Sequence, residues 1–80
     1  METTTEIIKT IVADTFNLDY VDVNDDTGPE NTESWDSFGQ MTLVLAIEKE
    51  FGFVLEYEEI FQILSTGTLI EVVKEKLNGS

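Results

Sequence analysis

The chain has 80 residues, 41% of them hydrophobic, with 17 acidic against 4 basic side chains and a net charge of −13. That length predicts a single domain over residues 1–80, and the hydrophobic content is too high for a disordered tail. There is no histidine and no cysteine, which excludes a serine–histidine triad, a thiolate nucleophile, a disulfide framework and a thiol metal site.

The negative charge bears on the partners. Such a field repels nucleic-acid phosphates and anionic membrane surfaces. We expect no nucleic-acid partner, and either a basic protein partner or a purely solubilising role for the acidic residues. No apolar run has the length of a membrane span. We therefore expect a soluble, cytoplasmic monomer.

Residues 3–16 are predicted to form the first helix. Thr3 and Glu6 have the spacing of a capping box, and apolar residues recur at helical intervals up to Phe16, before Asn17. Residues 17–35 form a long polar connection with a few apolar anchors. A connection this long in a small domain is more often functional or packed than flexible.

The second helix is predicted over 37–51, with Asp36 as N-cap and Gly52 just beyond its end. It has two apolar surfaces. One consists of Leu43, Val44, Ile47 and Phe51, and the other of Phe38, Met41 and Leu45. Burial of the helix on both sides explains most of these residues. Alternatively, the second surface is a docking surface or the rim of a ligand cavity.

The rest of the chain predicts two more helices. Residues 53–55 are expected to be extended packing without strand pairing, and 56–64 a short third helix with Ile60, Ile63 and Leu64 inward. Residues 65–67 break it. Thr68 and Glu71 have capping-box spacing and start a fourth helix that ends before Asn78 and Gly79. The fold class is all-α, a four-helix bundle with a long first loop and a short third helix.

Ser37 is the residue that suggests chemistry. At the first position of the second helix, its hydroxyl lies where orphan N–H groups and the helix dipole favour an attached anion by roughly 0.3–1 kcal/mol. Without a base, Ser37 is a better target for another enzyme than a nucleophile itself. Gly39 costs about 1 kcal/mol relative to alanine, and we interpret it as leaving room for a group on Ser37.

The sequence resembles the acyl carrier protein family. The resemblance is carried by Trp35-Asp36-Ser37-Phe38-Gly39, followed by Ala46-Ile47-Glu48-Lys49-Glu50-Phe51-Gly52, where the family has Asp-Ser-Leu before an amphipathic helix. It extends over nearly the whole chain, through Asp25-Asp26-Thr27, Glu58-Glu59-Ile60 and the last helix.

The resemblance implies a carrier without catalytic activity of its own. A phosphopantetheinyl transferase (holo-acyl-carrier-protein synthase) would attach 4′-phosphopantetheine from coenzyme A covalently to Ser37. Acyl intermediates would travel as thioesters on its thiol between acyl- or aminoacyl-transferring enzymes with basic docking surfaces. By position, the resemblance assigns partner recognition or cavity lining to Asp36, Phe38, Met41, Glu48 and Ile60. It implies no catalytic residue and no metal site in the chain.

Several departures from the family pattern leave the pathway open. Phe38 replaces the usual leucine, Gly39 and Thr42 stand where acids are common, Lys49 interrupts an acidic run, and the 65–69 connection is longer than usual. Fatty-acid synthesis, polyketide synthesis and specialised lipid, peptide or polysaccharide pathways are all compatible with the sequence.

Two other classes compete with the carrier. The acidic loop 22–33 matches ligand positions of a calcium-binding EF-hand, but Thr27 stands where glycine is needed and Pro29 removes a backbone donor. The other alternative is an acidic helical interaction module without a prosthetic group, which would share the fold.

Overall fold

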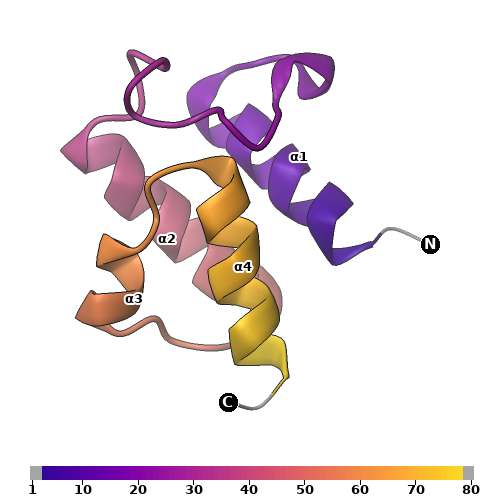
Figure 1. Ribbon diagram of the computed structural model, residues 1–80, viewed down its shortest axis with the longest axis vertical. Helices are drawn as coiled ribbons and strands as arrows, with labels where there is room; N and C mark the ends of the chain where they lie inside the picture. The colour runs from indigo at the N-terminus through magenta and orange to yellow at the C-terminus, as the bar shows by residue number, and fades with distance from the viewer. Residues whose placement is uncertain (1–2, 79–80) are drawn as a thin grey trace.

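Four α-helices and one 3-10 turn make up the protein, in a computed structural model that describes residues 3–78. They are α1 (Thr4–Phe16), η1 (Tyr20–Asp22), α2 (Ser37–Phe51), α3 (Tyr57–Phe61) and α4 (Thr66–Leu77). Helix α1 lies against both α2 and α4, and short α3 lies at the edge of the bundle (Figure 1). The predicted all-α bundle with one short helix is confirmed.

The ends of α1 and α2 follow from local signals. Both hydrogen bonds of the Thr3–Glu6 capping box form, and α1 ends at Asn17 in the left-handed conformation. The Asp36 carboxylate caps α2 by accepting from the backbone N–H of Gly39, and α2 ends at Gly52, which has a φ of 74°. Helix α2 therefore has the predicted bounds, and α1 begins one residue later than predicted because Thr3 is its N-cap. Caps and left-handed stops depend on neighbouring residues, which is why these ends could be predicted.

Helix α4 begins earlier than the capping pattern predicted. Its N-cap is Ser65, and Thr66 lies in the first turn, where its N–H and its hydroxyl donate to the carbonyl of Thr27 at 2.7 and 2.9 Å. The N–H of Gly67 donates to the carbonyl of Asp25 at 3.0 Å. The first loop thus satisfies the orphan donors of the helix. The predicted break at 65–67 is wrong, and so is the long 65–69 connection. Gly79, after the predicted end of α4, lies outside the described residues.

Helix α3 is shorter than predicted. It ends at Phe61 instead of continuing to Leu64, and none of its own residues is fully buried. Ile63, in the following turn, is buried as expected, whereas Leu64 is 69% exposed. Leu64 turns outward because the chain leaves the helix to bring Thr66 against the first loop.

The core consists of buried side chains from α1, α2 and α4, completed by residues of the connections. Leu55, from the extended 53–55 segment, joins it, and no strand forms within residues 3–78. The second apolar surface of α2 is exposed at Phe38, Met41 and Leu45. The interpretation that α2 is buried on both sides is therefore wrong, because α3 is too short to cover this face.

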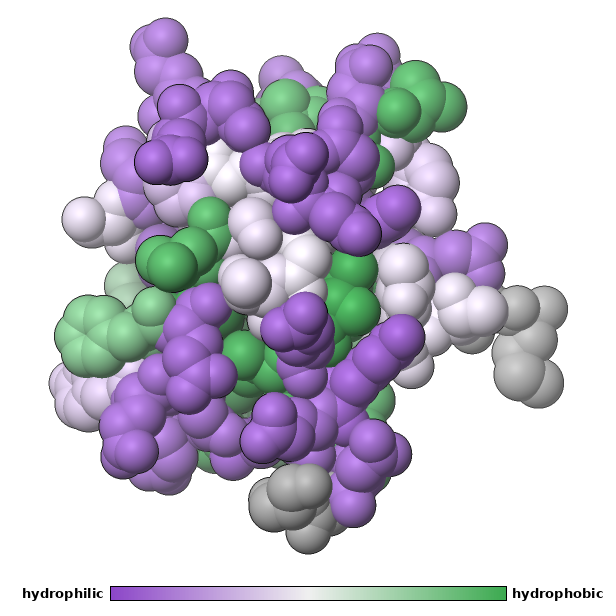
Figure 2. Space-filling model, in the orientation of Figure 1, coloured by the Kyte–Doolittle hydropathy of each residue, from purple (hydrophilic) through white to green (hydrophobic). Residues whose placement is uncertain are grey.

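Most of one face of the molecule is hydrophilic, with hydrophobic side chains gathered towards the side where α3 lies (Figure 2). Tyr57, Phe61 and Leu64 are the large exposed hydrophobic residues of α3 and the turn after it. None of the helices between residues 3 and 78 combines the length and apolar character that crossing a membrane requires.

Candidate functional site

Ser37 is exposed and is the first residue of α2. Its hydroxyl makes no hydrogen bond with the protein within residues 3–78. The neighbouring Asp36 is also exposed, and one of its carboxylate oxygens accepts from the N–H of Gly39 at 2.9 Å. The serine is therefore accessible to another enzyme, and Asp36 caps the helix on which the serine lies.

The segment that precedes Ser37 is fixed in the core. Trp35 is only 2% exposed, and its ring stacks on Phe16 with centroids 4.7 Å apart. Its indole N–H donates to the side-chain oxygen of Gln40 at 2.6 Å, and the hydroxyl of Ser34 donates to the carbonyl of Phe16 at 3.4 Å. This anchoring holds Ser37 at a defined place on the surface.

Gly39 is required for a reason other than the one inferred from sequence. A Cβ on Gly39 would lie 2.5 Å from the carbonyl oxygen of Ser34 and 2.7 Å from a ring carbon of Phe16. Both distances are far below van der Waals contact. Gly39 therefore permits the close approach of α2 to the preceding segment and to α1, and the interpretation that it leaves room for a group on Ser37 is wrong.

An apolar groove of about 530 Å³ opens beside Ser37, between α2 and α3. Ser37 itself belongs to its rim. The other lining residues come from the first loop, α2, α3 and the turn after α3: Pro29, Trp35, Asp36, Gln40, Met41, Tyr57, Ile60, Phe61, Ile63 and Leu64. A hydroxyl at the mouth of such a groove is well placed to carry a group whose apolar end can leave water.

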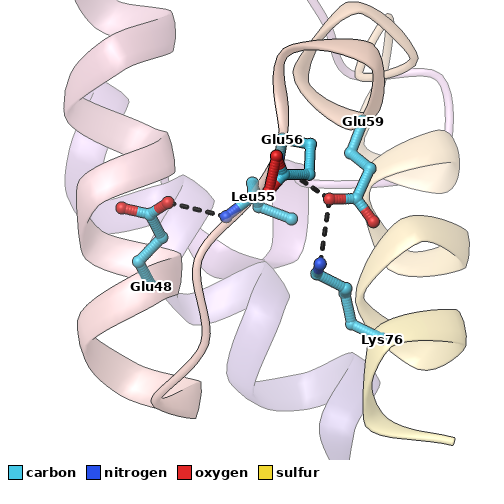
Figure 3. Close-up of polar contacts among 5 residues, drawn as sticks. All are labelled: Glu48, Leu55, Glu56, Glu59 and Lys76. Carbon is cyan, nitrogen blue, oxygen red and sulfur yellow. Dashed lines mark hydrogen bonds and ion pairs between the residues drawn. The ribbon is translucent and has the colours of Figure 1, made fainter. Parts of the chain in front are cut away.

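The structure brings some of the predicted recognition residues together and separates others. Asp36, Met41 and Ile60 line the same groove as Ser37, with Ile60 half-buried. Phe38 is 82% exposed and lies outside the groove lining. Glu48 is half-buried, and its carboxylate accepts from the backbone N–H of Leu55 at 2.8 Å (Figure 3). Glu48 thus fastens the α2–α3 connection to α2.

The sequence analysis assigns no site role to several lining residues, of which Trp35 and Gln40 matter most. Trp35 enters it only as part of the family motif, and Gln40 is not singled out. The amide nitrogen of Gln40 also donates to the carbonyls of Ile60 and Ile63, at 3.3 Å each. The signal that the sequence offers for Gln40 is its position, as a polar residue directly before the apolar Met41 near the start of an amphipathic helix.

Charge around the groove is predominantly negative. Helix α3 and its N-cap contribute Glu56, Glu58 and Glu59. The backbone N–H of Glu56, followed by the ammonium of Lys76, lowers the pKa of Glu59 below its usual value. Lys76 lies 3.0 Å from this carboxylate and joins α4 to α3 (Figure 3).

The acidic loop 22–33 uses its side chains to hold its own backbone. Asn24 accepts from the N–H of Asp26 at 2.9 Å, and Asn31 accepts from the N–H of Gly28 at 3.0 Å. Among residues 3–78 no three acidic, histidine or cysteine side chains converge as a metal site would need.

Comparison with known proteins gives one assignment. No protein-family model matches the sequence. The chain is 33% identical over 73 residues to an acyl carrier protein of Petrotoga mobilis, in an alignment that covers 91% of this chain and 86% of that protein. It therefore belongs to the acyl carrier protein family, whose members are carriers without catalytic activity and bear a 4′-phosphopantetheine prosthetic group.

Proposed function

We propose that the hydroxyl of Ser37 is the attachment point of 4′-phosphopantetheine, and that the protein carries acyl groups on it from one enzyme to the next. The observation that supports this most directly is the exposed Ser37 hydroxyl at the mouth of the apolar groove. The group would supply a thiol, to which acyl groups are joined as thioesters. This chain has no cysteine that could do so.

The first turn of α2 fits a phosphodiester on Ser37. The N–H of Gly39 is taken by Asp36, and the N–H of Gln40 donates to the carbonyl of Asp36 at 2.8 Å. Within residues 3–78 the backbone N–H groups of Ser37 and Phe38 have no acceptor in the protein. They remain free for phosphate oxygens, and the dipole of a 15-residue helix favours negative charge there.

Attachment requires a partner enzyme, because the chain has no histidine that could activate Ser37 and the neighbouring Asp36 carboxylate caps α2. A phosphopantetheinyl transferase would remove the hydroxyl proton, and the serine oxygen would attack the β-phosphate of coenzyme A. One phosphoester bond forms, the pyrophosphate bond breaks, and 3′,5′-ADP leaves. The role of this chain is to present the oxygen in a fixed position, which the Trp35–Phe16 stack provides.

The test is incubation of the purified protein with coenzyme A, Mg²⁺ and a transferase of broad specificity, followed by intact mass spectrometry. We expect one phosphopantetheine per chain, and none on the Ser37→Ala variant. Ser34→Ala is the matched control, since Ser34 is an exposed serine in the same segment. An unchanged mass for the folded parent, or modification that persists in Ser37→Ala, would refute the proposal.

Membership of the family implies a phosphopantetheinyl transferase and synthases as partners. For this chain we propose that they dock on the exposed apolar residues of α2 next to Ser37, chiefly Phe38, with basic surfaces that complement the net charge of −13. Phe38→Ser should lower kcat/KM for transfer to Ser37 without changing the fold. Val21→Ser, which replaces an equally exposed apolar residue on η1, is the control.

For the cargo, we propose an apolar acyl group. The groove suits an apolar acyl group in fatty-acid, polyketide or specialised lipid, peptide or polysaccharide synthesis. Loading the protein in turn with different acyl groups and measuring their transfer by candidate synthases would separate these pathways.

A further inference from the structure

Helix α3 is held in place by polar contacts at its two ends more than by burial of its own side chains. None of its five residues is fully buried, and Tyr57 and Phe61 are largely exposed. At its C-terminal end, the amide nitrogen of Gln40 on α2 donates to the carbonyls of Ile60 and Ile63. The carbonyl of Ile60 also accepts from the N–H of Ile63 at 3.1 Å, and Ile63 lies in the turn after the helix. Gln40 therefore ties both the last turn of α3 and the turn that follows it to α2.

The oxygen of the Gln40 side-chain amide also has a hydrogen-bond partner. Its oxygen accepts from the indole N–H of Trp35 at 2.6 Å, so one side chain joins α2, the segment before Ser37 and the end of α3. We call this arrangement the Gln40 bridge. Trp35, Gln40 and Ile63 all line the groove, and Trp35 and Ile63 also belong to the buried core. The bridge therefore lies where the groove meets the core.

At its N-terminal end α3 is fastened independently of Gln40. Glu59 pairs with Lys76 of α4 and accepts from the N–H of Glu56 at 2.7 Å, while Glu48 holds Leu55 (Figure 3). Breaking the Gln40 bridge would thus loosen only the C-terminal end of α3, where the buried side chain of Ile63 would remain as an anchor. An outward movement of this end would draw Ile63 away from the core and expose a way from the groove into it.

We propose that Gln40 is the positioning residue that sets how far an acyl chain carried from Ser37 can enter the protein. With the bridge intact, the chain lies in the outer groove against Met41, Ile60 and Phe61, which suits a short acyl group. A long chain can enter the core only by breaking the bridge. This inference rests on the proposed function, because the cargo is delivered from Ser37.

The decisive variant is Gln40→Glu. A carboxylate still accepts from Trp35 but cannot donate to the carbonyls of Ile60 and Ile63, so it releases α3 alone. Thr42→Glu adds the same charge at an exposed position of the same helix and is the control. Gln40→Met, which adds no charge, is a second variant in case the carboxylate impairs folding. We expect the Ile63 amide to exchange about tenfold faster in both Gln40 variants than in the control.

The chain-length test does not depend on a transferase. In a Ser37→Cys background the only thiol is at the mouth of the groove, and alkyl methanethiosulfonates attach butyl, octyl or dodecyl groups there as disulfides, with loss of the sulfinate. We expect the melting temperature to rise with the butyl group and no further with longer chains. With Gln40→Glu or Gln40→Met added, the rise should continue to dodecyl, with a shift of Trp35 emission.

Two results would overturn the inference. One is the same dependence on chain length in the Ser37→Cys background with and without the Gln40 substitutions. The other is a continued rise to dodecyl while the bridge is intact, with unchanged Trp35 emission. Failure of the transferase to modify Ser37 would instead count against the proposed function and would leave this alkylation series valid.

Discussion

Gly39→Ala tests whether the close approach of α2 to the preceding segment controls stability. Alanine is the better helix former by up to about 1 kcal/mol, so propensity alone predicts stabilisation. The structure predicts the opposite. The new methyl would lie 2.5 Å from the backbone carbonyl oxygen of Ser34, about 0.9 Å inside ordinary contact, and 2.7 Å from the ring of Phe16.

Neither the carbonyl of Ser34 nor the ring of Phe16 can move away at low cost in free energy. The oxygen of Ser34 belongs to the backbone, and Phe16 is stacked on Trp35 in the core. Overpacking of this kind costs about 1–3 kcal/mol. After the gain in propensity is subtracted, we expect a net loss of about 1 kcal/mol in the free energy of unfolding. For a domain of this size that lowers the melting temperature by roughly 4–8 °C.

The assay is urea unfolding followed by Trp35 fluorescence and by circular dichroism, with Gly67→Ala as the matched control. Gly67 also lies in the first turn of a helix, but its added Cβ would approach Asp25 only to 3.2 Å. The control should therefore lose less stability than Gly39→Ala. A Gly39→Ala variant as stable as the parent, or more stable, would show that the close approach imposes no strain and that our explanation of this glycine is wrong.

Three further outcomes are expected. Thr66→Val keeps the shape of a side chain that is fully buried but removes its hydrogen bond to Thr27, so urea unfolding should show a loss of about 1 kcal/mol; no loss would contradict the docking of the loop on α4. The lowered pKa of Glu59 means that its carboxylate contributes stability fully present above about pH 4.5 and lost as the pH falls through the lower folded value. Glu59→Gln should therefore be less stable than the parent near neutral pH and equal to it in acid, and an equal difference at every pH would argue against this linkage. Because the net charge is −13, added salt should raise the melting temperature by screening self-repulsion, and scanning calorimetry that finds no rise would show that repulsion does not limit stability.

The parts of the fold that could be predicted depend on neighbouring residues. The capping box at Thr3, the cap at Asp36 and the stop at Gly52 act within one helical turn, so α1 and α2 have the expected ends to within one residue. The start of α4 is also capped locally, by Ser65 with Thr68 at its third position, but the sequence offered a competing capping pattern at Thr68 and Glu71. The contact that accompanies the earlier start joins Thr66 to Thr27, 39 residues away in sequence, and no local pattern contains it.

The candidate site shows the same division. Ser37 could be found because a serine after an N-cap is a local feature, and family resemblance marked it independently. The roles of Gly39 and Gln40 could not, because both are set by residues that only folding brings near. Gly39 accommodates Phe16 from α1, and Gln40 reaches carbonyls of α3. The sequence shows Gly39 as an unusual residue in a helix but not its reason, and it does not distinguish Gln40 from any other polar residue on a helix surface.

The two sides of the groove are built differently, and this difference matters for a carrier. The side that bears Ser37 is anchored by a buried tryptophan stacked on α1, and moving it would expose a large apolar surface to water. The opposite side is α3, which buries none of its five residues fully and is held by hydrogen bonds, one ion pair, the partial burial of Ile60 and the buried residues that flank it. Such bonds are each worth about 1 kcal/mol net, so α3 can open at far lower cost than the serine can shift. The attachment point that we propose at Ser37 would have to stay in place, whereas the wall facing the cargo would have to adapt to it, and the distribution of buried surface in this chain meets both requirements.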